Sequence, residues 1–256
     1  MNTARVLYRP APAGIGLVTH PAPHVSTQEP ALDSVLQRPD VWRGRFHAPQ
    51  GGHVPTGHGA LDETLPGGGW PQGALTELLV AHTGIGELGL LMPALAALSR
   101  GEHWIAWIGA PHLPYAPALA AAGLRLGRLL LIQPATAKEG LWATEQTLRS
   151  GACAAVLAWP ERPDERALRR LQLAAEEGGA IGFLFRPGHA ARHASPAALR
   201  LALAPGDGEL IAQILKCRGG WSRHAVHLPR DCGDGHTLID GQNAEGAEAR
   251  RTRRMD

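Results

Sequence analysis

The sequence predicts an α/β fold with a mostly parallel sheet, helices on both faces, a terminal β-hairpin and a short N-terminal helix. Three observations predict it: apolar runs of strand length show no polar alternation, helix-length segments separate them, and glycines follow several of these segments. Strands without polar alternation are buried on both faces, which is typical of parallel sheets covered by helices. The pattern therefore gives the fold class before any motif is considered.

The predicted core alternates between strands and helices along the chain. Strands are expected where apolar runs are short, and helices where longer segments carry apolar residues at helical spacing. Three of the helices are followed by glycines, Gly123, Gly151 and Gly178. The expected strands are residues 74–79, 104–108, 129–132, 154–159 and 181–185, and the expected helices are residues 88–99, 114–122, 138–149 and 164–177.

Two further apolar runs follow this core. Residues 198–204 and 210–216 flank Pro205-Gly-Asp-Gly208, which is a turn sequence. They predict a hairpin that extends the sheet at its end.

A short helix is expected just before the core. Leu32, Val35 and Leu36 have helical spacing within residues 31–38, and Pro39 stops the helix. Trp42 follows, and we interpret it as an anchor for this helix, either on the domain or on a partner.

The two ends of the chain lack apolar periodicity. Residues 1–29 are rich in proline and predict a disordered leader, while residues 231–256 mix glycine with charged residues and predict a flexible tail. The expected domain is therefore residues 30–230.

Composition excludes several classes of function. The formal net charge of +2 is too near balance for wholesale wrapping of nucleic acid, so we expect weak or no direct DNA binding. No apolar run approaches the roughly 18 residues that a membrane span needs, and the three cysteines, an odd number, argue against a secreted disulfide framework. We expect a cytoplasmic protein that contacts no membrane. We also expect no metal, because no zinc-site spacing fits Cys217, His224, His227, Cys232 and His236.

The first strand-to-helix junction resembles a phosphate loop in position but not in chemistry. A working loop needs glycine at both ends, a Lys to neutralise the phosphates and a Ser or Thr to hold magnesium. The matching positions here are Ala81, Gly86, Glu87 and Leu88, so one glycine survives and a carboxylate replaces the Lys. We interpret the segment as a tight strand-to-helix turn and expect no cofactor. Residual nucleotide binding is the alternative.

Five segments together carry a likeness that no single one of them would establish. They are Pro55-Thr-Gly-His-Gly-Ala-Leu-Asp62, Leu65-Pro-Gly-Gly-Gly-Trp-Pro-Gln-Gly-Ala-Leu-Thr-Glu77, Trp107-Ile-Gly-Ala-Pro-His112, Leu130-Leu-Ile-Gln-Pro-Ala-Thr136 and Arg149-Ser-Gly-Ala-Cys-Ala-Ala-Val-Leu-Ala158. In combination they resemble the RecA superfamily and, within it, the ImuA proteins, which are relatives of SulA-like cell-division inhibitors. The resemblance covers roughly residues 40–220 and implies a RecA-like arrangement of the sheet.

The departures from the family pattern bear on catalysis. Pro111 stands where the resemblance implies a catalytic Glu, and Trp159 stands where it implies a metal-binding Asp. Losing the base and the metal ligand, in addition to the Lys of the loop, removes water activation and charge neutralisation from phosphoryl transfer. We therefore expect a RecA-like ATPase fold with degenerate sites and no ATPase activity.

The resemblance implies a function in the SOS response to DNA damage. It implies a non-catalytic accessory protein of translesion synthesis that binds an ImuB-like polymerase homologue and RecA, with an error-prone replicative-type DNA polymerase as an indirect partner. The alternative is a SulA-like inhibitor of cell division that acts on FtsZ. Lys216 and Arg218 resemble the basic pair with which RecA-type subunits reach a neighbour's ATP, and the period of a strand places both on one face. The expected partner-binding residues are Lys216, Arg218, Leu32, Val35, Leu36 and Trp42.

Overall fold

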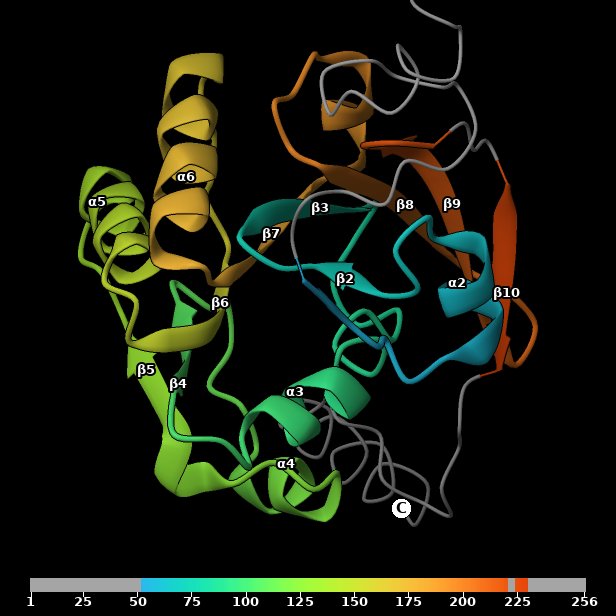
Figure 1. The fold of residues 1–256 in the computed structure, drawn as a ribbon, viewed down its shortest axis with the longest axis horizontal. Coiled ribbons are helices and arrows are strands. Elements are labelled where there is room, and N and C mark those ends of the chain that lie inside the picture. The colour runs from blue at the N-terminus through green and yellow to red at the C-terminus, as the bar shows by residue number, and fades with distance from the viewer. Residues whose placement is uncertain (1–51, 221–223, 230–256) are drawn as a thin grey trace, which may run out of the picture. The chain divides into compact units, whose positions relative to one another are not determined.

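A computed structural model describes residues 52–220 and 224–229 of this chain, and an eight-stranded sheet forms their centre (Figure 1). The strands are β3 (Ala74–Val80), β4 (Trp104–Ile108), β5 (Leu129–Ile132), β6 (Cys153–Ala158), β7 (Ile181–Pro187), β8 (Leu199–Pro205), β9 (Glu209–Cys217) and β10 (Ala225–Pro229). Their order across the sheet is β10-β9-β8-β3-β7-β6-β4-β5.

The strands from β8 to β5 are parallel, and β9 and β10 are antiparallel additions at the other edge. All seven residues of β3 are buried, because β3 lies between two strands and is covered on both faces. This explains why the parallel strands show no polar alternation in the sequence.

Helices cover both faces of the sheet. One face packs on α3 (Met92–Leu98) and α4 (Ala116–Ala121), together with the buried Leu61 of α2 (Gly59–Thr64). The other face packs on α5 (Ala137–Arg149) and α6 (Glu165–Gly178). Shorter elements are η1 (Leu126–Arg128), η2 (Gly188–Arg192) and a two-stranded ribbon of β1 (His53–Val54) and β2 (Trp70–Pro71).

The two long helices begin and end where their capping residues place them. The Thr136 side chain accepts a hydrogen bond from Glu139 N–H, and the Glu139 carboxylate accepts one from Ala135 N–H, so both residues cap the start of α5. Asp164 caps α6 in the same way, and Gly179 ends it with a φ of 70°. These signals are local, which is why the sequence predicts both helices to within one residue.

The structure confirms an α/β fold with a mostly parallel sheet, helices on both faces and a terminal hairpin. Two helix predictions are too long: the helix expected over residues 88–99 begins at Met92, and the one expected over 114–122 covers only Ala116–Ala121. Residues 88–91 form hydrogen-bonded turns after Gly86, whose φ of 98° lies outside the helical region. The sequence also did not predict α2 or β10, because both are short.

Several predictions fall on residues that the structure does not describe. They are the disordered leader, the helix over residues 31–38 with Leu32, Val35 and Leu36, the anchor Trp42, and the flexible tail. Within residues 52–220 and 224–229, no helix is both long and apolar enough to cross a membrane.

Candidate functional site

The loop after β3 is the first feature of the candidate site. Ala81 to Leu88 leave the carboxyl end of β3, which is the edge where open α/β sheets bind ligands. Gly84 and Gly86 have φ angles of 88° and 98°, a region that residues with a Cβ rarely adopt. The two glycines give the loop the tight turn that we expected from the sequence.

Glu87 is buried inside this loop, with 3% of its surface exposed. Its Oε1 accepts a hydrogen bond from Gly84 N–H at 3.0 Å, and its Oε2 accepts one from Ile85 N–H at 2.9 Å. In the sequence, Glu87 stands where a phosphate loop has its Lys. The structure adds that its carboxylate already occupies two backbone donors of the loop.

A row of aromatic rings crosses the same edge of the sheet. Trp159 follows β6 and stacks on Phe185 of β7, with ring centroids 4.4 Å apart and planes 3° apart. On its other side lies Trp107 of β4, with a centroid separation of 5.9 Å. Aromatic carbon therefore fills the position at which the resemblance implies a metal-binding Asp. Pro111, the other substituted position, lies exposed in the loop after β4.

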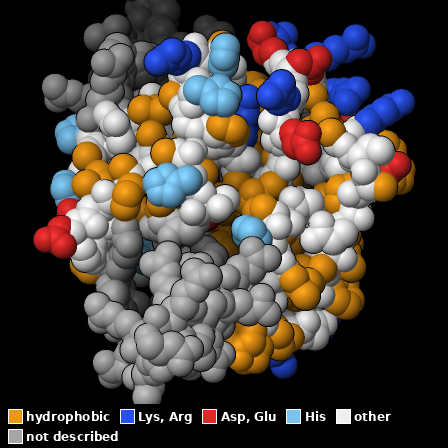
Figure 2. All heavy atoms as spheres, turned by 180° about the vertical axis from the view of Figure 1, so that it is seen from behind, with side chains coloured by type: hydrophobic (Ala, Val, Ile, Leu, Met, Phe, Trp, Pro, Cys, Tyr) orange, Lys and Arg blue, Asp and Glu red, His pale blue; other side chains and the backbone are white. Residues whose placement is uncertain are grey.

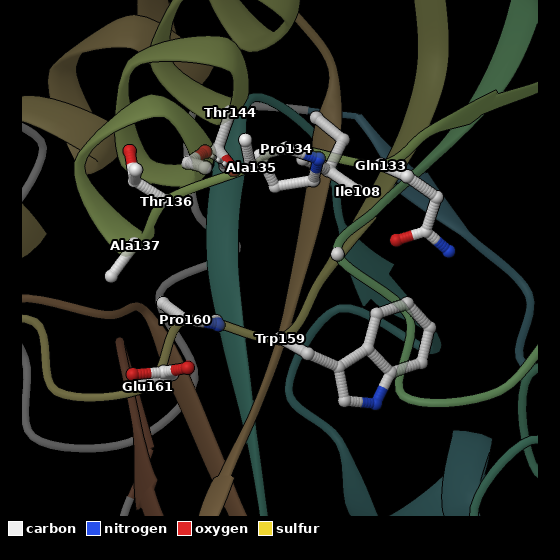
Figure 3. A pocket seen from close by; sticks show the side chains of 12 residues that line it. Ile108, Gln133, Pro134, Ala135, Thr136, Ala137, Thr144, Trp159, Pro160 and Glu161 are labelled. Carbon is white, nitrogen blue, oxygen red and sulfur yellow. Dashed lines mark hydrogen bonds between the residues drawn. The ribbon is translucent and has the colours of Figure 1, made fainter.

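A small pocket of about 190 Å³ lies between the carboxyl ends of β4, β5 and β6. The chain leaves β4 toward one face of the sheet and leaves β5 and β6 toward the other, so the pocket sits where the connections diverge. Figure 3 shows Gln133, Thr136, Trp159 and Glu161 around it. Three of its polar side chains already have partners within the chain: Thr136 caps α5, Gln133 donates to the Ala110 carbonyl and Thr144 donates to the Gly140 carbonyl.

A buried ionic cluster joins three central strands on the α6 face. The Glu77 carboxylate of β3, which is fully buried, accepts hydrogen bonds from Arg186 of β7 at 2.8 Å, Arg200 of β8 at 2.7 Å and the Ser195 hydroxyl at 2.8 Å. Arg200 also donates to the carbonyls of His193 and Ala190, which fastens the segment after β7 to the sheet.

The sequence contains a partial signal for this cluster. Glu77 is a charged residue inside an apolar run, and a buried carboxylate needs a partner. Arg200 is its direct neighbour in the parallel register of β3 and β8, but 123 positions separate the two in sequence. The pairing depends on the strand order, which the local sequence does not show.

Lys216 and Arg218, the predicted partner-binding pair, lie near this cluster at the end of β9. The Lys216 ammonium donates to the Ser195 carbonyl at 2.6 Å, and Arg218 pairs with Glu176 of α6 at 3.5 Å. Burial lowers the pKa of Lys216, and the nearby charges of Arg200 and Arg218 lower it further. Both side chains are exposed, but each already has a contact within the chain.

Charged residues on α6 are largely balanced by neighbours. Arg169 pairs with Glu165 and Arg170 pairs with Glu145 of α5. Figure 2 shows Lys and Arg side chains mixed with Asp and Glu side chains at one upper corner of the molecule. Within the ranges that the structure covers, no three His, Cys, Asp or Glu side chains form a group able to hold a metal ion.

Comparison with known proteins finds relatives for one segment of this chain. Residues 73–182 match the family described as cell division inhibitor SulA. A cell division inhibitor SulA of Edwardsiella piscicida is 39% identical over 100 residues, which are 38% of this chain and 58% of that protein. Residues 73–182 are SulA-like.

The SulA-like segment includes the loop of residues 81–88 and ends at the start of β7. Protein ImuA of Caulobacter vibrioides is 28% identical over 190 residues, which cover 64% of this chain and 78% of that protein. A crystal structure of SulA from Pseudomonas aeruginosa matches 44% of this chain and 98% of its own, at 30% identity and a TM-score of 0.38.

Proposed function

We propose that this chain is a non-catalytic accessory protein of SOS translesion DNA synthesis that binds an ImuB-like polymerase homologue and RecA. The observation that carries the proposal is the extent of the match to protein ImuA, which covers 64% of this chain against 38% for the SulA of Edwardsiella piscicida. The longer match necessarily includes residues outside the SulA-like segment.

The absence of catalysis is part of the same proposal. Two features support it: the Glu87 carboxylate occupies loop amides that a phosphate would need, and the ring of Trp159 stands where the resemblance implies a metal ligand. Phosphoryl transfer depends on charge neutralisation and on a positioned metal. The RecA-like arrangement of the sheet also belongs to this proposal, and the central position of β3 with its following loop supports it.

Exposed apolar side chains support a role in protein binding. Six large side chains are at least 40% exposed in the half of the sheet that carries β4 and β5. Such surface on a soluble domain is characteristic of contacts with other proteins. They are Trp104, Leu113, Tyr115, Leu130, Leu131 and Trp142.

The second candidate function is inhibition of cell division through FtsZ. It is favoured by the higher identity to SulA, 39% against 28% for ImuA. One experiment separates the two. A strain that lacks this gene is assayed for damage-induced mutant frequency, and a strain that overproduces the protein is assayed for cell length.

The translesion proposal expects loss of induced mutagenesis in the deletion strain and normal cell length on overproduction. Filamentous cells with unchanged mutagenesis would instead support the FtsZ function. A pull-down with the ImuB-like homologue and with purified FtsZ is the matching biochemical test.

A further inference from the structure

The contact between Glu87 and its own loop has the form of an anion bound by backbone amides. Each carboxylate oxygen takes one N–H, from Gly84 at 3.0 Å and from Ile85 at 2.9 Å. Two consecutive amides that point to one side, next to glycines with positive φ, form the kind of concave site in which proteins hold phosphate oxygens. Here the anion is supplied by the chain itself.

The carboxylate depends on these amides. Glu87 is 3% exposed, and among the described residues no Lys, Arg or His forms an ion pair with it. A buried carboxylate needs compensating donors, and the two amides supply them. Equally, the Ile85 amide needs an acceptor, because Ile85 is itself buried. Each side of the contact therefore stabilises the other.

Two different mechanisms would exclude a phosphate from this loop. Charge repulsion would act at a distance and would vanish once the carboxylate is neutralised. Occupancy would act because the Glu87 side chain already accepts the hydrogen bonds of the loop amides. It would persist as long as a side chain of this size accepts them. The hydrogen bonds of both carboxylate oxygens favour occupancy.

We propose that the Glu87 carboxylate is a built-in ligand of the 81–88 loop. The carboxylate takes the place of a phosphate group and holds the loop in its observed conformation without any nucleotide. The loop is then insensitive to nucleotide concentration. This inference concerns the loop alone and holds whichever partner the protein binds.

The test compares Glu87→Ala with Glu87→Gln, using pyrophosphate as the probe. Glu87→Ala empties the amides, and we expect saturable pyrophosphate binding by calorimetry that the wild type lacks, with shifts of the Gly84 and Ile85 amide signals by NMR. Glu87→Gln removes the charge but keeps the side chain, and we expect no binding. Glu63→Ala, on an exposed residue of α2, makes the same change in net charge and should also bind none.

Two results would overturn the proposal. Equal binding by the Gln and Ala variants would mean that repulsion and not occupancy excludes phosphate. No binding by a folded Ala variant would mean that the loop amides are not an anion site.

Hydrogen exchange provides a second measurement that does not need the Ala variant to fold. A glutamine has one acceptor oxygen in place of two, so in Glu87→Gln one of the Gly84 and Ile85 amides should exchange about tenfold faster than in the wild type. Unchanged exchange at both amides would contradict the contact itself.

Discussion

Replacing Glu77 by Gln tests whether the buried ionic cluster holds the centre of the sheet together. The substitution keeps the shape of the side chain and removes its charge. The side chains of Arg186 and Arg200 then remain 8% and 7% exposed without a counter-charge. Breaking a buried pair by removing one partner costs about 3–5 kcal/mol. For a domain of this size, each kcal/mol lowers the melting temperature by about 2–4 °C, so we expect a decrease of about 6–20 °C.

The assay is urea unfolding and thermal unfolding, both followed by circular dichroism, with Glu165→Gln as the control. Glu165 forms an exposed ion pair with Arg169 on α6, and such pairs contribute about 0.3–0.5 kcal/mol. A triple replacement of Glu77, Arg186 and Arg200 by Met should recover most of the loss, because no charge is then left buried. An effect of Glu77→Gln no larger than that of the control would refute the reasoning.

ATP with magnesium should not raise the melting temperature or be hydrolysed, whereas a ligand at about 100 times its dissociation constant adds about 2.7 kcal/mol; a clear shift would contradict the proposed lack of nucleotide binding. Replacing Lys216 and Arg218 by Glu should leave the fold intact, because both are exposed, and should abolish co-sedimentation with RecA filaments; unchanged co-sedimentation would remove this pair from the RecA contact. Burial raises the pKa of Cys217 to about 11 from 9.0, so its alkylation at pH 9 should be slower in the native than in the unfolded protein. Between pH 9 and 11 the thiol loses its proton mainly in the unfolded state, so the free energy of unfolding should fall as the pH rises through this range.

The fold could be predicted from sequence wherever the signals are local. Strand β4 and strand β5 were predicted to the residue, because each is an apolar run bounded by polar or glycine residues. The hairpin of β8 and β9 was predicted from its turn sequence. The start of α3 was not, because Leu88, Leu90 and Leu91 continue the apolar pattern through hydrogen-bonded turns that precede the helix.

The candidate site could be predicted only in part. Its loop was located from the glycines and from its place after the first core strand. The hydrogen bonds of Glu87 could not be predicted, because a carboxylate that repels phosphate and one that occupies the loop amides look identical in sequence. The stacking of Trp159 on Phe185 could not be predicted, because the two rings meet only through the pairing of β6 with β7.

The boundary of the SulA-like segment bears on where the two candidate functions diverge. The segment stops at residue 182, so it contains the loop, α5 and α6 but not the rest of β7 or the strands β8 to β10. Glu77 lies inside the segment, while both of its arginine partners lie beyond it. The added strands are therefore joined to the shared part through a buried cluster, and they carry Lys216 and Arg218 at their exposed end. Under the translesion proposal, the function that separates this chain from SulA should depend on residues outside 73–182, and exposed variants within residues 183–229, such as those of Lys216 and Arg218, should lower damage-induced mutagenesis without changing the fold.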